Sequence, residues 1–588
     1  MAELAHGVHR PQSFIARYVF STDHKVIGIQ YMITAMFMAI AGGALAMIVR
    51  MQLAWPGEKW RLLGKMFPDG VEGDIMKPEF YLSLMTMHGT IMIFFVVSLA
   101  LIGGFGNFLI PLQIGARDMA FPFLNMLSFW TIVPACLIML GSFAVEGGAA
   151  QAGWTAYPPL SAVGAAVPGS QWGQTLWILG MALFIASFTM GGLNFVCTIL
   201  DQRTKGMSLM RMPITIWTLF ISSAIGLLAF PPLLAAAILL LFDRHFGTSF
   251  FLPSGLYFGS GVLPNSGGTP LLWQHLFWFL GHPEVYVLIL PALGITLDML
   301  PVFSRKPVFG YRLTVYCLYA IAGLSMIVWG HHMYVSGMSP YIGEFFAIGT
   351  LSITVPSAII GVNMIASLWG GSLRFPTPML FTIGTIIMFG TGGFGGIFLG
   401  NATSDIQLHD TYFVVGHFHL MIGGVTLMAA FAGVYYWFPK MFGRMMNETL
   451  GKLHFWVTMP TFYVLFLAQH FQGLGGMPRR YFDFDKYEYL QKMAAANLHV
   501  SLTAFVLGAV QFVFLFNFFW SAFKGARSVK NPWCATTLEW TEASPAPHGN
   551  WGEQLPEVHR WPYDYSVPGA AEDFTPQTAP GSVAPVTF

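Results

Sequence analysis

The sequence predicts an all-α integral membrane protein in which twelve helices cross the bilayer. Of its 588 residues, 55% are hydrophobic and 9% are charged, whereas a soluble domain carries roughly 25% charged residues. Twelve apolar segments reach the length of about 20 residues that a bilayer requires. The formal net charge of +1 provides no field that would attract nucleic acid, so we expect membrane lipid and no nucleic acid as surroundings.

The twelve expected spans alternate in direction, so an even number places both termini on one side. The spans are 26–50, 80–111, 119–145, 172–200, 213–241, 269–299, 308–336, 341–369, 377–400, 409–438, 453–473 and 492–522. The sequence therefore divides into an N-terminal segment (1–25), a twelve-helix membrane-spanning domain (26–525), and a mostly extended tail (526–588).

The distribution of basic residues predicts the side of the membrane on which the termini lie. The loops after the third, seventh and ninth spans contain no Lys or Arg, whereas those after the fourth, sixth, eighth and tenth hold Arg203, Lys205, Arg211, Arg305, Lys306, Arg312, Arg374, Lys440, Arg444 and Lys452. Further basic residues flank the outermost spans: Arg10, Arg17, Lys25, Lys524, Arg527 and Lys530. Because basic loops stay inside, both termini are expected in the cytoplasm.

Two histidines in the stretch 408–420 are the centre of the functional prediction. His417 and His419 lie two residues apart in an apolar run, so their side chains point about 200° apart on a helix. One ion cannot use both imidazoles, but two cofactors on opposite sides of the helix can, as a haem takes an axial imidazole. The alternative is two buried histidines that bond to neighbouring helices.

Depth in the membrane favours the metal interpretation. A rise of 1.5 Å per residue places His88 about 12 Å below the outer boundary and His417 with His419 about 12 to 15 Å below it. His282 lies about 17 Å down, and His331 with His332, near the outer end of the seventh span, about 8 Å down. Six histidines from four spans thus meet in the outer half of the bilayer, where buried polar groups tend to mark function.

Geometry divides these six imidazoles among three metals. His88 and His419 can ligate one iron from both faces, which gives a low-spin haem that only passes electrons, and His417 can hold a second haem from one face. His282, His331 and His332 remain, and three neutral imidazoles without a thiolate suit copper. An open iron that faces a copper is a site for a small diatomic molecule, with O2 as the leading candidate.

Helix positions near the copper ligands predict a path for protons. His282 and Tyr286 are four residues apart and share a helix face, so the phenol can supply a proton and an electron at the metal. Glu284 points to the opposite side, near the bilayer midplane, where burial disfavours its charged form. Asp118 and Asn125, at the cytoplasmic start of the third span, can lead water toward Glu284. Asn194 and Ser187 can continue that track or be ordinary packing polarity.

Charged groups also gather at the outer surface. Arg479 and Arg480 lie in an outer loop where basic residues are disfavoured, and haem propionates are anions suited to bidentate pairing with them. A tolerated exception to the charge rule is the alternative. His409 and Asp410 lie at the outer mouth of the tenth span and suit a hydrated magnesium ion. A helix N-terminal acid explains Asp410 equally well.

Several sequence strings closely resemble subunit I of the haem-copper respiratory oxidases. They are MTMHGTIMIFF, GARDMAFPFLN, WFLGHPEVYVLILP, VWGHHMYVSGM, LHDTYFVVGHFH and GMPRRY, and the resemblance runs from Ser21 to Thr541. It implies low-spin haem at His88 and His419, the oxygen-reducing haem at His417, copper at His282, His331 and His332, and magnesium at His409 and Asp410. It also implies a covalent link between His282 and Tyr286, haem A, propionate contacts at Arg479 and Arg480, a formyl contact at Arg50, and a proton path through Asp118, Asn125 and Glu284.

Two departures from the family pattern bear on protons and on the electron donor. The usual lysine of a second proton path aligns with Ile360, so that path is in doubt, and the polar neighbours Ser357 and Asn363 can carry water instead. Quinol-oxidising members carry an arginine and an aspartate where this chain has Ala41 and Leu45. We therefore expect cytochrome c or a similar soluble donor.

The resulting prediction is the catalytic subunit of a proton-pumping terminal oxidase in a bacterial cytoplasmic membrane. Its four cysteines include no Cys-x-x-Cys pair, so a dicopper centre must come from a second subunit. A third subunit and smaller subunits are expected as further partners. The alternatives are a quinol oxidase, a nitric oxide reductase with non-haem iron, or a proton-coupled secondary transporter, which would show no haem absorbance.

Overall fold

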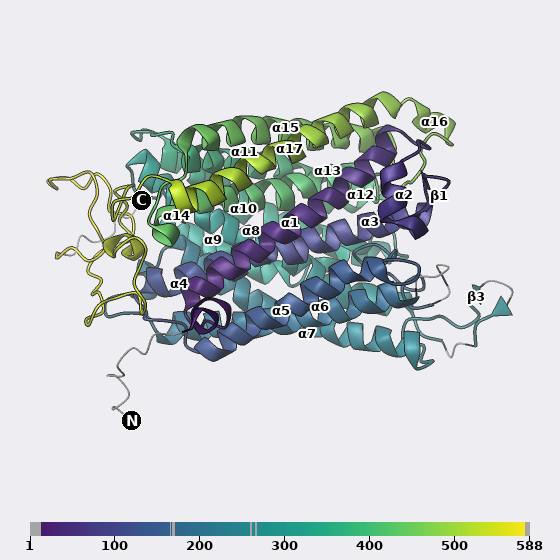
Figure 1. The fold of residues 1–588 in the computed structure, drawn as a ribbon, viewed down its shortest axis with the longest axis horizontal. Helices are drawn as coiled ribbons and strands as arrows, with labels where there is room; N and C mark the ends of the chain where they lie inside the picture. Colours follow the sequence, from purple (N-terminus) through teal and green to yellow (C-terminus); the bar gives the residue numbers. More distant parts are fainter. Residues whose placement is uncertain (1–12, 165, 167–170, 259–260, 265–266, 582–588) are drawn as a thin grey trace.

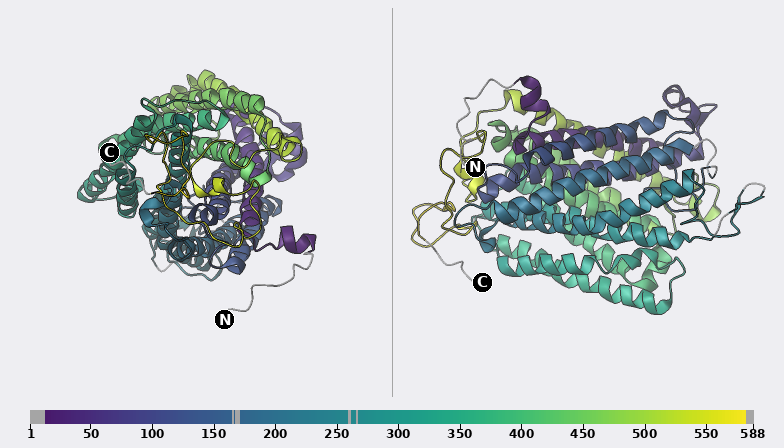
Figure 2. Two further views of the ribbon diagram at one scale, coloured as in Figure 1. Left: turned by 90° about the vertical axis from the view of Figure 1, so that its left-hand side faces the viewer. Right: turned by 90° about the horizontal axis from the view of Figure 1, so that it is seen from below.

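The computed structural model describes residues 13–581, apart from 165, 167–170, 259–260 and 265–266. Long helices lie side by side in an elongated bundle, and the chain after the last helix gathers at one end (Figures 1 and 2). Arg10, which the sequence placed among the basic residues of the N-terminal segment, lies outside the described residues.

The bundle is built from fourteen long or medium helical elements among the described residues. They are α1 (His24–Ala54), α3 (Pro78–Thr90), α4 (Asn107–Ile114), α5 (Pro122–Gly141), α6 (Gln171–Asp201), α7 (Ile214–His245), α8 (Pro270–Ser304), α9 (Tyr311–Ser325), α10 (Pro340–Leu368), α11 (Thr377–Gly400), α13 (Tyr412–Phe418), α14 (Thr426–Phe442), α15 (Glu448–Leu474) and α17 (Ala494–Lys524). Short elements complete it: α2 (Arg61–Met66), α12 (Ala402–Leu408), α16 (Glu488–Gln491), and the antiparallel hairpins of β1 (Val71–Glu72) with β2 (Ile75–Met76) and β3 (Tyr257–Phe258) with β4 (Gly261–Val262).

Two spans continue through wider helical turns. The π-helical segments Ile91–Val97 and Leu99–Gly106 join α3 to α4, and His419–Val425 joins α13 to α14. A π-turn rotates the side chains that follow it, and such turns are frequent at functional sites. Both spans carry histidines that the sequence analysis singled out.

Membrane-spanning character follows from length and composition. In the described part of the chain, ten helical spans are long and apolar enough to cross a membrane. The other two expected spans correspond to α9, which has 15 residues before it breaks, and to α15, which has 27. The fold is therefore the predicted all-α, many-span membrane bundle.

The centre of the bundle is the span Pro78–Ile114 together with α8. In both, 89% of the most apolar window is buried inside the protein, whereas for α1, α10 and α17 the value is 28%. The outer helices thus leave most of their surface for lipid. The two central spans carry four of the residues with which chemistry was associated: His88, His282, Glu284 and Tyr286.

The tail packs across one end of the bundle, which we call the tail end. Residues 526–588 were expected to be extended, and their described part, 526–581, contains one short 3₁₀ helix, Leu538–Thr541. They are nevertheless well packed, because Trp540, Tyr563 and Tyr565 are almost fully buried. Basic loop residues hold the tail: Lys205 pairs with Glu557 at 2.9 Å, and Arg374 with Asp573 at 3.1 Å.

Candidate metal centres and proton path

Three imidazoles converge beside α8. The ligand nitrogens of His282, His331 and His332 all lie within 4.8 Å of one another. The Nε2 atoms of His282 and His332 are buried and have no hydrogen-bond partner among the described residues. His331 binds the Thr350 hydroxyl through Nδ1 at 2.8 Å, an outer contact of the kind that orients a ligating imidazole. Together the three can hold one ion.

The two adjacent histidines lie on a tight turn rather than on the helix that was expected. Helix α9 ends at Ser325, and His331 and His332 belong to the 3₁₀ segment Trp329–Met333. This turn brings both rings toward α8, with centroids 4.4 Å and 5.7 Å from that of His282. The indole of Trp278 stacks on His332 at 3.8 Å and fixes its plane.

His88 and His419 face each other across the interior. Their ring centroids lie 6.3 Å apart and their planes differ by 11°. Each imidazole uses Nδ1 for a backbone carbonyl, His88 with Gly42 and His419 with Val415, both at 2.9 Å. That bond leaves Nε2 of each ring for a shared metal. In metal sites, a hydrogen bond from the other ring nitrogen orients the ligating imidazole in the same way.

His417 lies on the other side of the same span. Its Nδ1 bonds to the Gly392 carbonyl of α11 at 2.9 Å, whereas His419 stacks on Phe466 of α15. Gly395 and Gly396 of α11 pass close to the His417 ring, and a Cβ on Gly395 would lie 2.9 Å from its Nδ1. The structure therefore separates the two histidines onto opposite flanks.

These donor sets fit two haems and a copper ion. All six imidazoles offer nitrogen donors, and five of them are anchored or aimed by a defined neighbour. Among the described residues, no thiolate or carboxylate belongs to the three-histidine cluster. Imidazole suits both haem iron and copper. When bound, such groups supply electron transfer and the reduction of a small molecule.

Tyr286 lies beside the copper ligands. Its ring centroid is 4.8 Å from that of His282, as expected for residues one turn apart on α8. Its hydroxyl is thus a proton-holding group next to the three-histidine cluster.

Glu284 lies on the opposite face of α8 and is almost completely buried. The Ser98 hydroxyl donates to Glu284 Oε1 at 3.2 Å, and Oε2 has no partner among the described residues. One oxygen is thus held and the other can exchange a proton with water.

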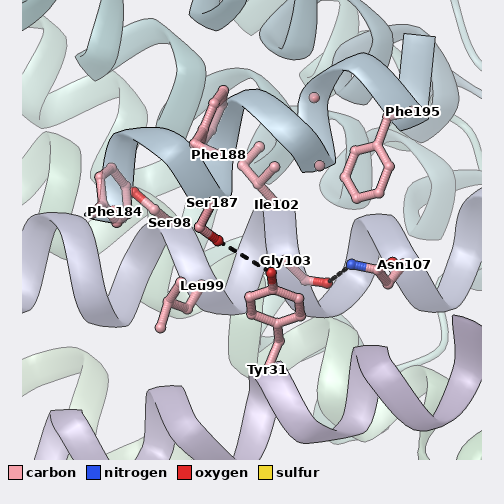
Figure 3. Close-up of a pocket in the computed structure, with 12 residues that line it drawn as sticks. Tyr31, Ser98, Leu99, Ile102, Gly103, Asn107, Phe184, Ser187, Phe188 and Phe195 are labelled. Atoms are coloured by element: carbon pink, nitrogen blue, oxygen red, sulfur yellow. Dashed lines mark hydrogen bonds between the residues drawn. The ribbon is translucent and has the colours of Figure 1, made fainter. Parts of the chain in front are cut away.

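A small cavity extends from Ser98 to Asn107 and Phe195 (Figure 3). Its volume of about 30 Å³ is enough for about two waters. Tyr31, Ser98, Asn107 and Ser187 supply its polar lining, and the Tyr31 hydroxyl bonds to those of Ser128 and Ser187 at 3.0 and 3.4 Å. Tyr31, Ser98, Asn107 and Ser128 were missed from the sequence, because single polar residues in separate helices form no pattern.

Asp118, Asn125 and Asn194 occupy the tail end of this track. Burial raises the pKa of the Asp118 carboxyl, and nearby His24 opposes that shift only in part. Asn125 is fully buried, and neither its Oδ1 nor its Nδ2 has a partner among the described residues. Asn194 is different, because its amide bonds to both backbone groups of Phe121 at 2.9 and 3.1 Å. It therefore shapes the loop, in agreement with the packing alternative.

The outer charged residues form one cluster at the end opposite the tail. Arg479 makes an ion pair with Asp410, and its backbone N–H donates to the Asp410 carbonyl at 2.9 Å. His409 Nε2 lies 3.9 Å from Asp410 Oδ2, while Nδ1 binds Asp405 at 3.0 Å. Burial raises the pKa of Asp410, but Arg479, His409 and Arg480 outweigh it and lower the pKa overall. Asp405 is a partner that the sequence analysis missed.

Arg50 has defined hydrogen-bond partners, and so has Asn363 near Ile360. Arg50 donates from Nε to the Ser501 hydroxyl and from Nη2 to the Asn497 carbonyl, both at 3.0 Å. Ile360 is fully buried, and Asn363 donates to Thr314 Oγ1 at 2.9 Å. Ser357 is only half-buried and makes no hydrogen bond recorded between described residues. These side chains do not form a continuous polar track.

The fold and this arrangement of histidines define a haem-copper oxidase catalytic subunit. Residues 26–506 match the family model described as cytochrome c and quinol oxidase polypeptide I, and the chain belongs to that family. It is 48% identical over 575 residues to the alternative cytochrome c oxidase subunit 1 of Bradyrhizobium diazoefficiens, covering 97% of this chain and 95% of the relative. It is 43% identical over 550 residues to cytochrome c oxidase subunit 1 of Thermostichus vulcanus, with 94% and 93% covered. A solved haem-copper terminal oxidase dimer shares the fold, with a TM-score of 0.64, 18% identity and coverage of 86% of this chain and 85% of that one.

Proposed function

We propose that this subunit reduces O2 to water with electrons from cytochrome c or a similar soluble donor, and couples this reaction to proton pumping. The observation that supports it best is the sorting of six histidines into a cluster of three, a facing pair and a single residue. These sets match a copper ion, a six-coordinate haem and an open haem. The last two carry haem A in this proposal, with Arg50 near the formyl group of the low-spin haem.

The protein side chains position protons around these metals. Tyr286 holds a proton on its phenol oxygen one turn from His282. Glu284 holds a proton between the Ser98 hydroxyl and a free oxygen. Protons reach it from Asp118 and Asn125 through the cavity lined by Tyr31, Asn107 and Ser187. A buried carboxyl that alternates between two water-accessible sides provides a place where charge is moved against the membrane potential.

The donor and the other subunits follow from what this chain carries. Ala41 and Leu45 occupy the positions where quinol-oxidising members have charged residues, and the relatives described above are named cytochrome c oxidases. The four cysteines lie apart as free thiols, so subunit II supplies the dicopper centre. Subunit III and further small subunits cover part of the exposed apolar helices.

The outer cluster binds magnesium and haem propionates in this proposal. His409 and Asp410 are close enough to share a hydrated divalent ion. Asp410 already pairs with Arg479, and the Arg479 Nε is buried without a partner among the described residues, so that guanidinium can accept a second anion. The basic tail end faces the cytoplasm of a bacterial cell and both termini lie there.

Spectroscopy of the purified complex tests the function. A reduced-minus-oxidised spectrum should show two haems, and carbon monoxide should shift only one. Metal analysis should find copper, and an oxygen electrode should record O2 consumption with reduced cytochrome c. Colourless protein free of copper would refute the oxidase function, and non-haem iron in place of copper would indicate a nitric oxide reductase.

A further inference from the structure

A second polar line enters the bundle from the tail end between α7 and α8. Asp298 of α8 is almost fully buried, and its Oδ1 accepts from the backbone N–H of Ile214 at 3.1 Å and from the Tyr563 hydroxyl of the tail. Its Oδ2 is buried without a partner among the described residues. Capping the start of α7 therefore uses one oxygen, and the second remains for a proton.

Hydroxyls continue the line along α7. Thr215, Thr218 and Ser222 recur at three- and four-residue spacing, so they share one helix face, and all three are fully buried. The Ser222 hydroxyl has no partner among the described residues, and the Thr215 hydroxyl lies beside the Asp298 carboxyl. Thr218 donates to the Thr215 carbonyl at 2.9 Å and lies so close to Gly294 of α8 that a Cβ there would clash with its Oγ1. Buried polar groups of this kind are ordinarily satisfied by water.

The line rises to the level of the cavity below Glu284. Ser222 is seven residues, or about 10 Å, further into the bundle than Thr215. One turn beyond it, Gly226 packs directly against the Phe188 ring of α6. Phe188 also lines the cavity that holds Tyr31, Ser98 and Ser187 (Figure 3). The Phe188 ring therefore contacts both this part of α7 and the cavity.

We propose that Asp298, Thr215, Thr218 and Ser222 form a second proton line that supplies the cavity below Glu284. Each hydroxyl passes its proton forward and accepts one from behind, with waters between them, so no group is oxidised or reduced. The line adds a supply of protons in a chain whose usual lysine position is Ile360. At the start of the line, the Tyr563 hydroxyl of the tail donates to Asp298. This inference rests on the proposed proton delivery through Glu284.

Isosteric variants in the complete oxidase complex test the line. Thr218→Val removes one hydroxyl and nearly keeps the shape of the side chain. The matched control is Thr296→Val, because Thr296 on α8 is equally buried and donates to its own helix, at the Ala292 carbonyl, at 2.8 Å. Both are combined with Asp118→Asn, which closes the first route. Turnover and proton uptake are measured, and the haem spectra verify assembly.

We expect Asp118→Asn to retain some turnover. Adding Thr218→Val to it should slow turnover about tenfold further, which corresponds to an activation barrier higher by ~1.4 kcal/mol. Adding Thr296→Val to Asp118→Asn should leave the remaining turnover unchanged. Equal turnover with and without Thr218→Val, or no turnover at all in Asp118→Asn, would overturn the second line. If Asp118→Asn pumps like the unmodified enzyme, the route through Asp118 is wrong, and Thr218→Val against Thr296→Val still decides the second line.

A water-resolving experimental structure provides an independent measurement. We expect ordered water at Asp298 Oδ2, Thr215 Oγ1 and Ser222 Oγ. A dry interface between α7 and α8 would contradict the proposal whatever the kinetics show.

Discussion

His88 and His419 hold their imidazole rings almost parallel, with centroids 6.3 Å apart. This arrangement would let one haem iron lie between the two rings and take an imidazole from each side. The pair comes from two different spans, and both rings are anchored through Nδ1. The geometry is therefore set by backbone carbonyls before any metal binds.

We expect His88→Ala to abolish the low-spin haem spectrum and to retain the haem that binds carbon monoxide. The reason is that His88 contributes only to the facing pair, while His417 is anchored separately on α11. Optical difference spectra measure both signals. His499→Ala, at an exposed position, is the control and should keep both. An intact low-spin band in His88→Ala would show that the assignment is wrong.

Replacing Glu284 with Gln should stop proton pumping and slow turnover by roughly 10²-fold, the scale of a lost acid–base group. The amide keeps the bond to Ser98 but cannot carry the proton, so both haems should still assemble. Proton release from reconstituted vesicles is the measurement, and the exposed Glu344→Gln is the comparison. Normal pumping in Glu284→Gln would refute the role of this carboxyl.

The Asp118 carboxyl should make stability fall as pH rises above about 4. Burial raises its pKa in the folded protein, while the unfolded value is about 3.9. Between these two values the folded state binds more protons than the unfolded state, so unfolding becomes easier with rising pH. Thermal unfolding in detergent across this window should show the slope in the unmodified protein and a smaller one in Asp118→Asn. An identical slope in both would contradict the prediction.

Ile360→Lys should leave turnover unchanged or lower it. The position is fully buried, so an introduced ammonium loses its hydration. Of its two polar neighbours one turn away along the helix, Asn363 is already bonded to Thr314. Steady-state O2 consumption, compared with Ile360→Met as a neutral chain of similar length, measures the effect. A large gain in the lysine variant would mean that the natural chain is limited at this step.

A divalent ion at His409 and Asp410 can be detected with manganese. Enzyme from manganese-grown cells should show a bound Mn²⁺ signal by electron paramagnetic resonance, and Asp410→Asn should lose it because it removes the oxygen that faces His409. Asp485→Asn, at an exposed position in the same outer region, should keep the signal. Equal Mn²⁺ signals in both variants would place the ion elsewhere.

Much of the fold could be predicted because lipid imposes a simple rule on sequence. Spans need about 20 apolar residues, and the alternation of basic loops put Lys205, Arg374 and Lys440 at one end, where the structure has them bound to the tail. The break after Ser325 could not be predicted, because apolar residues continue through Met326 to Val328 with no proline or glycine among them to end the helix.

The histidine positions could be predicted because their depth follows from spacing along helices. Their anchors could not, since Gly42, Val415 and Gly392 act through backbone carbonyls that leave no mark on side-chain identity. The same applies to Ser98 and Tyr31, which come from separate spans and meet only when the bundle packs.

The packed tail has a consequence for biosynthesis. Asn550 bonds to His24 and Lys25 at the start of the first helix, more than five hundred residues earlier, at 3.0 and 2.8 Å. These bonds can form only after almost the whole polypeptide has left the ribosome. The start of the first helix therefore gains its final contacts late in synthesis, so ribosome-stalled chains that end before Asn550 should display a more protease-sensitive start of that helix.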